Sequence, residues 1–529
     1  MRCRRLAMTL LCLMVLPSIT VAQSARESIM QLQKLNRFYR YLESVYVDSV
    51  AMAPLVESAM RSMLAELDPH STYLNAEEMQ SQRESFEGEF SGVGIEYNIH
   101  NDSIMVVNTV AGGPAERVGL MPNDRIVVID GENVVGINRN DVSSKLRGPR
   151  GSVVAIGVAR HGVDSLMDFS ITRDNIPITT VDAAFLAADG VGYIKVNRFA
   201  GTTMREFREA MHSLGDVDAL ILDLCGNGGG LLDQAVEMAG YFLPPQALVV
   251  YNEGRAMRPE YYRAETGGEF SGSVVVLIDG NSASASEIVS GALQDWDRGV
   301  IVGNTSFGKG LVQRQIPMGD GSAVRLTVAR YHTPTGRVIQ RPYEKGQKAK
   351  YYNDYVERVT GQAKDSLTAE RPVFETLQLK RKVYGGGGIE PDFVVKNDTT
   401  AVSDYLVKVV AQGVYADYMM EYMDAHRVQL EQLYPTFEEF SANFVLSDEA
   451  LQHFVAKATA KGVEFDKDGF ERSKGLIRDQ LTAMIAQRLF STSEFYRVMN
   501  PRQSEYYKKA LEVLSRRSAD GTIGSMLKN

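Results

Sequence analysis

Residues 274–313 read VVVLIDGNSASASEIVSGALQDWDRGVIVGNTSFGKGLVQ, and this stretch decides the fold of the chain. Its first five residues form a β-branched, apolar run that is typical of a buried strand. Polar and small residues end that run, and a helical pattern of apolar residues begins near Ser284. A second apolar run, 299–302, leads to Lys309 between two glycines. Strands alternating with a helix predict an α/β core.

Three polar residues of this stretch suggest nucleophilic chemistry. Ser284 is expected at a strand-to-helix turn, where unpaired backbone N–H groups and the helix dipole suit an oxyanion. Lys309 could act as a base, because burial disfavours the charged amine and lowers its pKa. Gln313 follows four residues later on the same face and could orient that amine. The spacing alone leaves open a plainer interpretation: small residues pack a helix tightly against a sheet, and the lysine lies in a solvated loop.

The same stretch resembles the core of the carboxy-terminal processing proteases, which are PDZ-containing, tail-specific serine peptidases. Their Gly-Ser-Ala-Ser-Ala-Ser-Glu segment matches residues 281–287 except that Asn281 replaces the glycine, and their Phe-Gly-Lys-Gly and Gln match residues 307–313. The resemblance implies that Ser284 is the nucleophile and Lys309 its base, oriented by Gln313. It also implies an α/β, ClpP/crotonase-like protease core with an inserted β-rich PDZ domain and helical N- and C-terminal regions.

Residues 1–22 have the pattern of a secretory signal. Arginines at positions 2, 4 and 5 precede an apolar run over 6–16, which is too short to span a bilayer as a helix. We therefore expect cleavage and a periplasmic protein, with an uncleaved, anchored form as the alternative.

Composition limits the remaining classes of function. The 529 residues exceed one hydrophobic core, so several domains are expected. A net charge of −9 and the lack of a long basic run argue against nucleic acid as a partner. Without the signal, Cys225 is the only one of three cysteines to remain, which excludes an intramolecular disulfide. The seven histidines are scattered, so we expect no metal and no cofactor.

Residues 23–85 have apolar residues at helical spacing. A segment that begins Leu-Asp-Pro at residues 67–69 breaks this pattern and resembles the one before the family's PDZ module. His70, in this segment, is interpreted as a polar turn histidine rather than a catalytic one.

Residues 86–173 alternate strand-like runs with turns and resemble a PDZ domain of the bacterial protease type. PDZ domains add a peptide as an extra strand and hold its terminal carboxylate in a nest of backbone N–H groups. The matching peptide-binding loop consists of Ser91, Gly92, Val93 and Gly94. Farther on, Arg150 is interpreted as a surface charge, whereas Arg147 could either be one or couple peptide binding to the protease.

Residues 174–396 are expected to form the catalytic core. A glycine-rich loop, 226–230, follows an apolar strand, and glycines let a backbone approach a bound group closely. The resemblance implies that the N–H groups of Gly229 and Ala285 stabilise the oxyanion. The loop departs from the family pattern at positions 225, 226 and 228, and Cys225 is expected to be a buried structural thiol because no basic partner lies nearby in sequence.

The rest of the chain carries no second catalytic motif. Residues 341–385 are expected to be a helical insertion on the surface of the core, and 397–529 a helical domain for packing or assembly.

Together, these patterns and the resemblance imply a periplasmic serine endopeptidase that cuts proteins or peptides with free C-termini near that end, with the PDZ domain recognising the substrate tail. An adaptor protein and a homo-oligomer are possible partners. Two alternatives remain: a PDZ scaffold with a decayed protease core, and an esterase-like hydrolase that pairs Ser284 with His332.

Overall fold

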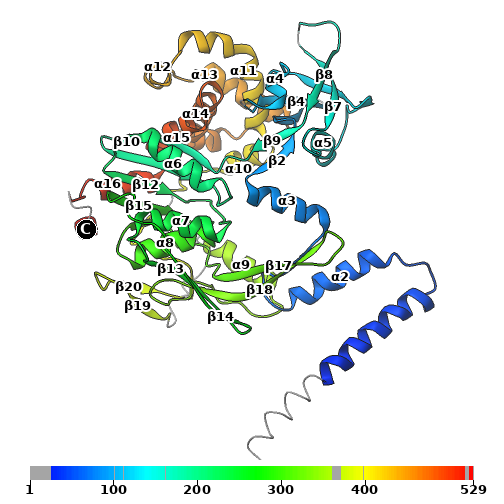
Figure 1. Ribbon diagram of the computed structural model, residues 1–529. Coiled ribbons are helices and arrows are strands. Elements are labelled where there is room, and N and C mark those ends of the chain that lie inside the picture. The colour runs from blue at the N-terminus through cyan, green and yellow to red at the C-terminus, as the bar shows by residue number, and fades with distance from the viewer. Residues whose placement is uncertain are drawn as a thin grey trace, which may run out of the picture.

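The structure is a computed structural model that describes residues 26–100, 102–110, 112–160, 162–359, 371–396, 398–518 and 523–527 (Figure 1). The expected signal, 1–22, lies outside these residues. No helix among them is long and apolar enough to cross a membrane.

A six-stranded sheet forms the centre of the molecule, and all its neighbouring strands are parallel except the first pair. In spatial order its strands are β10 (Val181–Ala188), β11 (Val191–Val196), β12 (Ala219–Asp223), β15 (Ser273–Ile278), β16 (Val300–Gly303) and β21 (Phe393–Val394). The crossover helices are α6 (Thr203–Leu214), α7 (Leu232–Phe242) and α8 (Ala285–Asp295). Strands buried on both faces explain the continuous apolar runs of the sequence.

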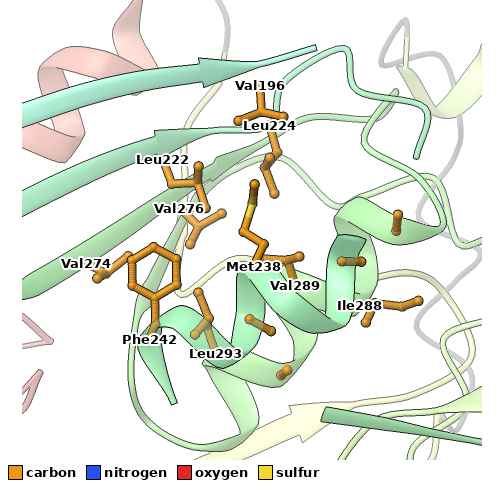
Figure 2. Close-up of a cluster of buried hydrophobic side chains, with 14 of the residues drawn as sticks. Val196, Leu222, Leu224, Met238, Phe242, Val274, Val276, Ile288, Val289 and Leu293 are labelled. Atoms are coloured by element: carbon orange, nitrogen blue, oxygen red, sulfur yellow. The ribbon is translucent and has the colours of Figure 1, made fainter. Parts of the chain in front are cut away.

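Helices cover both faces of this sheet. Alternate residues of β12 and β15, such as Leu222 and Val276, pack against Met238, Phe242 and Val289 of the crossover helices (Figure 2). The residues between them pack on the other face against the C-terminal helix α16 (Glu505–Leu514). The end of the chain is therefore part of the core packing.

A second, antiparallel sheet includes β17, which continues from the stretch 274–313, and a strand from the N-terminal region. Its strands are β1 (Thr72–Leu74), β13 (Leu248–Gly254), β14 (Met257–Arg263), β17 (Leu311–Pro317) and β18 (Ala323–His332). Because β1 pairs with β18, the segment before β1 lies next to the strand that follows Lys309.

A β-rich module with its own hydrophobic core is inserted after the helix α3 (Ala76–Glu87). Its strands are β3 (Ile95–His100), β4 (Ser103–Thr109), β5 (Arg125–Ile129), β6 (Glu132–Asn133), β7 (Val153–Ala159) and β8 (Met167–Thr172), and its helices are α4 (Pro114–Arg117) and α5 (Arg139–Leu146). The chain enters and leaves the module through the paired strands β2 (Glu89–Gly92) and β9 (Asp174–Pro177).

Helices make up both ends of the described chain. A helix over residues 26–45 and α2 (Met52–Ala65) form an arm that extends away from the body (Figure 1). The C-terminal helices with a core of their own are α10 (Asp404–Ala411), α11 (Val414–Leu433), α12 (Phe437–Asn443), α13 (Asp448–Ala460) and α14 (Lys467–Leu489). The next helix, α15 (Thr492–Gln503), packs against β10.

The insertion after residue 340 contains α9 (Lys348–Val359) and the hairpin strands β19 (Val373–Glu375) and β20 (Lys382–Tyr384).

Candidate active site

Ser284 lies in the turn between β15 and α8, directly before the first helical residue. Its backbone has φ 54° and ψ −110°, a conformation that costs an L-residue about 1–3 kcal/mol. Ser284 is partly exposed, whereas Ala283 and Ala285 on either side are buried. The Ser282 hydroxyl donates to the Leu224 carbonyl at 2.8 Å and ties this turn to the neighbouring strand. A strained strand-to-helix turn that presents a serine is typical of α/β hydrolases.

The glycine-rich loop after β12 lies directly against Ser284, because β12 and β15 are parallel neighbours whose carboxyl ends meet at one edge. Gly229 has φ 98°, and a Cβ added to it would lie only 2.8 Å from the Ser284 Cβ. Only glycine fits this approach. The Gly229 N–H donates to Asn227 Oδ1 at 2.9 Å, so binding an oxyanion would require this N–H to change its partner. No hydrogen bond to the Ala285 N–H occurs among the described residues.

Lys309 lies in the loop between β16 and β17, and its environment favours the neutral amine. Burial lowers the pKa of Lys309 to about 8, and the positive charge of Arg325 acts in the same direction. The carboxylate of Glu287 opposes this shift without cancelling it. A lysine with this pKa can accept a proton near neutral pH.

Glu287 joins the serine turn to the lysine loop. This side chain is fully buried, and one carboxylate oxygen accepts from the Ser284 N–H at 2.8 Å and the Lys309 N–H at 2.9 Å. The other oxygen accepts from the Ser306 hydroxyl at 2.5 Å and the Gly308 N–H at 2.7 Å. Burial raises the pKa of Glu287. Sequence analysis missed this role, although the spacing Ser-x-x-Glu at a helix start is a capping-box signal that indicated part of it.

His70 lies at the same site, which its sequence context did not indicate. The Gln313 side-chain Nε2 donates to the His70 carbonyl at 2.8 Å, and the His70 ring lies 6.3 Å from that of Phe307. Burial and the positive charge of Lys309 lower the pKa of His70 to about 3, so the ring stays neutral. His70 lies in a bend, as expected of a turn histidine, and its side chain is buried against the rings of Phe307 and Tyr351. The Gln313 amide oxygen remains the atom that could accept from the Lys309 amine.

The insertion helix α9 packs over the lysine loop. Tyr351 is 3% exposed, and its ring contacts those of His70 and Phe307 at 5.4 and 6.1 Å. The Arg358 guanidinium donates to the carbonyls of Ser306 and Phe307 at 2.8 and 3.1 Å. The insertion contains a helix, as expected, but the inner face of that helix packs against the lysine loop and does not lie free on the surface.

A buried arginine, Arg341, also packs against the aromatic rings beside the lysine loop. The Arg341 guanidinium lies 4.0 Å from the ring centre of Tyr351 and 5.0 Å from that of Phe307, and the Arg341 N–H donates to the Gly308 carbonyl at 2.9 Å. The hydrogen bonds and ring contacts of the insertion thus fix the backbone on the N-terminal side of Lys309.

His332 has partners outside this cluster. Its ring stacks on Tyr251 at 4.5 Å, and Nδ1 lies 3.2 Å from the Gly336 carbonyl oxygen. Neither partner belongs to the serine turn or the lysine loop.

Cys225 is half-buried after β12, and burial raises the pKa of its thiol well above the ordinary value. Its carbonyl accepts from Lys195, which also pairs with Asp223 at 3.0 Å. A thiol with a raised pKa is a poor nucleophile. Among the described residues, no group of three or more histidine, cysteine, aspartate or glutamate side chains could hold a metal ion.

In the β-rich module, the residues of the expected peptide-binding loop lie where β2 leads into β3. Val93 is buried in the module's core, and Gly94 has φ 76°. The following strand, β3, lies at the edge of the module's sheet. Arg147, at the end of α5, donates to Glu84 of α3 at 2.6 Å, so it connects the module to the helix that leads to the core. Arg150 is largely exposed and pairs with Asp174.

Comparisons with known proteins agree with this architecture. Peptidase family S41 matches residues 190–346, a PDZ domain matches 105–160, and the N-terminal domain of the activating protease CtpB matches 17–78. A family of unknown function matches residues 405–491.

Individual relatives extend these matches. A carboxy-terminal-processing protease of Bartonella bacilliformis is 35% identical over 336 residues, which cover 62% of this chain and 77% of the relative. The carboxy-terminal processing protease CtpB of Bacillus subtilis is 35% identical and covers 61% of this chain and 68% of its own. Among solved structures, a photosystem II D1 C-terminal processing protease has 31% identity and a TM-score of 0.33, covering 57% of this chain and 82% of its own.

The fold, the PDZ domain and the S41 match define a serine-type peptidase with an α/β core, which confirms the predicted fold class. Within that class, the chain belongs to the carboxy-terminal processing protease family.

Proposed function

We propose that this protein is a periplasmic endopeptidase that cleaves proteins near their C-termini with a Ser284–Lys309 dyad. The observation that carries the proposal is the shared carboxylate of Glu287, which holds the backbone of both residues within one buried network. The lowered pKa of Lys309 supports it, because a base must be neutral before it accepts a proton.

In the proposed reaction, the Ser284 hydroxyl attacks the peptide carbonyl and its proton passes to the Lys309 amine. Collapse of the tetrahedral intermediate breaks the C–N bond, and Lys309 returns the proton to the leaving amine. Water then attacks the acyl-enzyme ester, again with Lys309 as the base, and releases a carboxylate and free Ser284. Gln313 orients the amine through its amide oxygen while its Nε2 stays bound to His70.

The oxyanion would be bound by the N–H groups of Ala285 and Gly229. Loss of one such donor typically costs 10²–10³-fold in rate. Because Gly229 donates to Asn227, substrate binding must release that N–H.

The PDZ loop formed by residues 91–94 is proposed to hold the substrate's terminal carboxylate, with the tail added as a strand beside β3. Through its hydrogen bond to Glu84, Arg147 then couples peptide binding by the module to α3.

The test is cleavage of an unstructured protein with an apolar C-terminal tail, compared with the same protein carrying a charged tail. Ser284→Ala and Lys309→Ala are each expected to abolish cleavage while the thermal unfolding transition stays cooperative, and His332→Ala is expected to retain it. Cleavage that persists in Lys309→Ala but is lost in His332→Ala would favour an esterase-type site instead. A folded wild-type protein that cleaves none of these substrates would favour a non-catalytic PDZ scaffold.

A further inference from the structure

The guanidinium of Arg325 is an unpaired positive charge next to the catalytic lysine. Arg325 lies on β18, and its Nε is buried without a hydrogen-bond partner. No carboxylate of the described residues lies within ion-pair distance of it. A buried donor without a partner is unfavourable, so a ligand that accepts a hydrogen bond from it would bind more tightly.

The register of β17 and β18 places Arg325 two residues before the residue that lies opposite Gln313. Thr327 lies opposite Gln313, and Arg325 lies opposite Gln315. Residues two apart on a strand share a face and lie roughly 7 Å apart. Arg325 is therefore on the same face as Gln313, near enough for its charge to lower the pKa of Lys309.

A cavity of about 530 Å³ lies in front of Arg325. The helix α3 forms its other wall with residues including Ser81, Gln82, Ser85 and Phe86. The helix α3 runs from β1 to β2, so the cavity lies beside the segment that leads into the module with the PDZ loop; Figure 1 shows α3 between that module and β18. A substrate whose end is held by the module would cross this cavity on the C-terminal side of the cut bond.

The acidic residues of the cavity do not neutralise Arg325. Glu78 pairs with Arg61 at 2.9 Å and accepts from the Asn75 N–H at 2.8 Å. Glu77 is exposed and makes no ion pair within the described ranges.

We propose that Arg325 binds a carboxylate of the substrate, so that the enzyme prefers chains with an acidic group shortly after the cleavage site. The carboxylate can be an aspartate or glutamate side chain, or the chain terminus of a substrate with a short tail. This proposal rests on the proposed function of the site.

The test uses unstructured peptides with one apolar tail, in which a single glutamate replaces glutamine at successive positions after the cut. At one position, glutamate is expected to raise kcat/KM roughly five- to tenfold over glutamine. In Arg325→Gln, the ratio of kcat/KM for the glutamate peptide to that for the glutamine peptide should be about one. In Arg325→Lys, part of the glutamate preference should remain. Arg314→Gln is the matched control. Arg314 is exposed on the neighbouring strand β17 and lies opposite Leu326 in the register, so it is on the other face of the sheet from Arg325. Peptides with a short tail that ends in either a free carboxylate or an amide separate the two sources of the carboxylate. If cleavage depends on the free terminal carboxylate, and Arg325→Gln removes that dependence, the group that binds Arg325 is the chain terminus.

Binding of the same peptides to Ser284→Ala protein, measured by fluorescence anisotropy, tests the contact without cleavage. A glutamate preference that is the same in Ser284→Ala and in Ser284→Ala with Arg325→Gln would overturn the Arg325 proposal. Cleavage that depends on Ser284 but shows no charge preference would overturn it while leaving the proposed function intact. Absence of cleavage with a preserved charge preference in binding would count against the peptidase function alone.

Discussion

At the scale of single residues, the neutral amine of Lys309 sets the expected pH dependence. With a pKa of about 8, about a tenth of Lys309 is neutral at pH 7 and half at pH 8, so kcat/KM should rise about tenfold from pH 7 to a plateau above pH 9. Removing the nearby positive charge with Arg325→Gln should raise the pKa and move the profile to higher pH.

The measurement is a pH–rate profile with an uncharged-tail peptide. Arg314→Gln should leave the profile in place. A rate that is flat between pH 7 and 9 in the wild-type protein would contradict a lysine base. His70 should not contribute a step above pH 5, because its pKa lies at about 3.

The Glu287 carboxylate is the second residue with a measurable consequence. Glu287→Gln leaves one acceptor oxygen for four donors and turns an NH₂ group toward N–H groups. We expect a loss of about 2–3 kcal/mol in the free energy of unfolding. We also expect kcat to fall by at least about tenfold with little change in KM, because the serine and lysine lose their common anchor.

Urea unfolding and steady-state kinetics check both expectations. Glu206, on α6, accepts hydrogen bonds from the N–H and the hydroxyl of Thr180 at 2.7 and 2.8 Å. Glu206→Gln is therefore the matched control for changing a hydrogen-bonded carboxylate. It should lower stability without lowering kcat. An equal loss of kcat in both variants would show that the effect is general destabilisation.

At the scale of elements, α9 determines how firmly the lysine loop is held. Tyr351→Ala removes ring contacts to Phe307, His70 and Arg341 and leaves a cavity beside the loop. Amide hydrogen exchange over residues 306–310 should become faster, and kcat should fall.

Lys350→Ala, on the exposed side of the same helix, removes only a surface pair with Glu344 and should change neither quantity, since such pairs are worth about 0–1 kcal/mol. Unchanged exchange over 306–310 in Tyr351→Ala would mean that the loop is rigid without α9.

The limits of sequence reasoning also appear at this scale. The strand and helix around Ser284 were predictable, because periodicity and the turn residues are local signals, and Lys309 follows in the same stretch. The roles of His70 and Tyr351 were not predictable, because they depend on a contact between residues 281 positions apart. A helix was expected in the insertion that contains α9, but only the tertiary packing shows which face of that helix is buried.

At the scale of the whole molecule, the first helix of the N-terminal arm, over residues 26–45, is notable because nearly all of its side chains are exposed. This helix exposes large apolar side chains: Ile29, Met30, Leu32, Leu35, Phe38, Tyr41 and Val45. Contiguous apolar surface of this kind marks an association site. We expect the arms of two or more copies to cover one another.

Sedimentation velocity over a range of concentrations measures this association. Replacing Leu32, Leu35 and Phe38 by serine should shift the protein to monomer, whereas replacing the polar neighbours Lys34 and Arg37 should not. A wild-type protein that stays monomeric at about 100 μM would contradict self-association, since specific dimers commonly have Kd values well below that concentration.

The position of α16 has a consequence for the timing of activity. During synthesis, the serine and lysine leave the ribosome long before the helix that covers the second face of their sheet. Until that helix arrives, the apolar residues on that face remain open to water, and the dyad lacks a settled scaffold. The scaffold of the proposed dyad is therefore complete only once α16 has been made and has packed on the sheet.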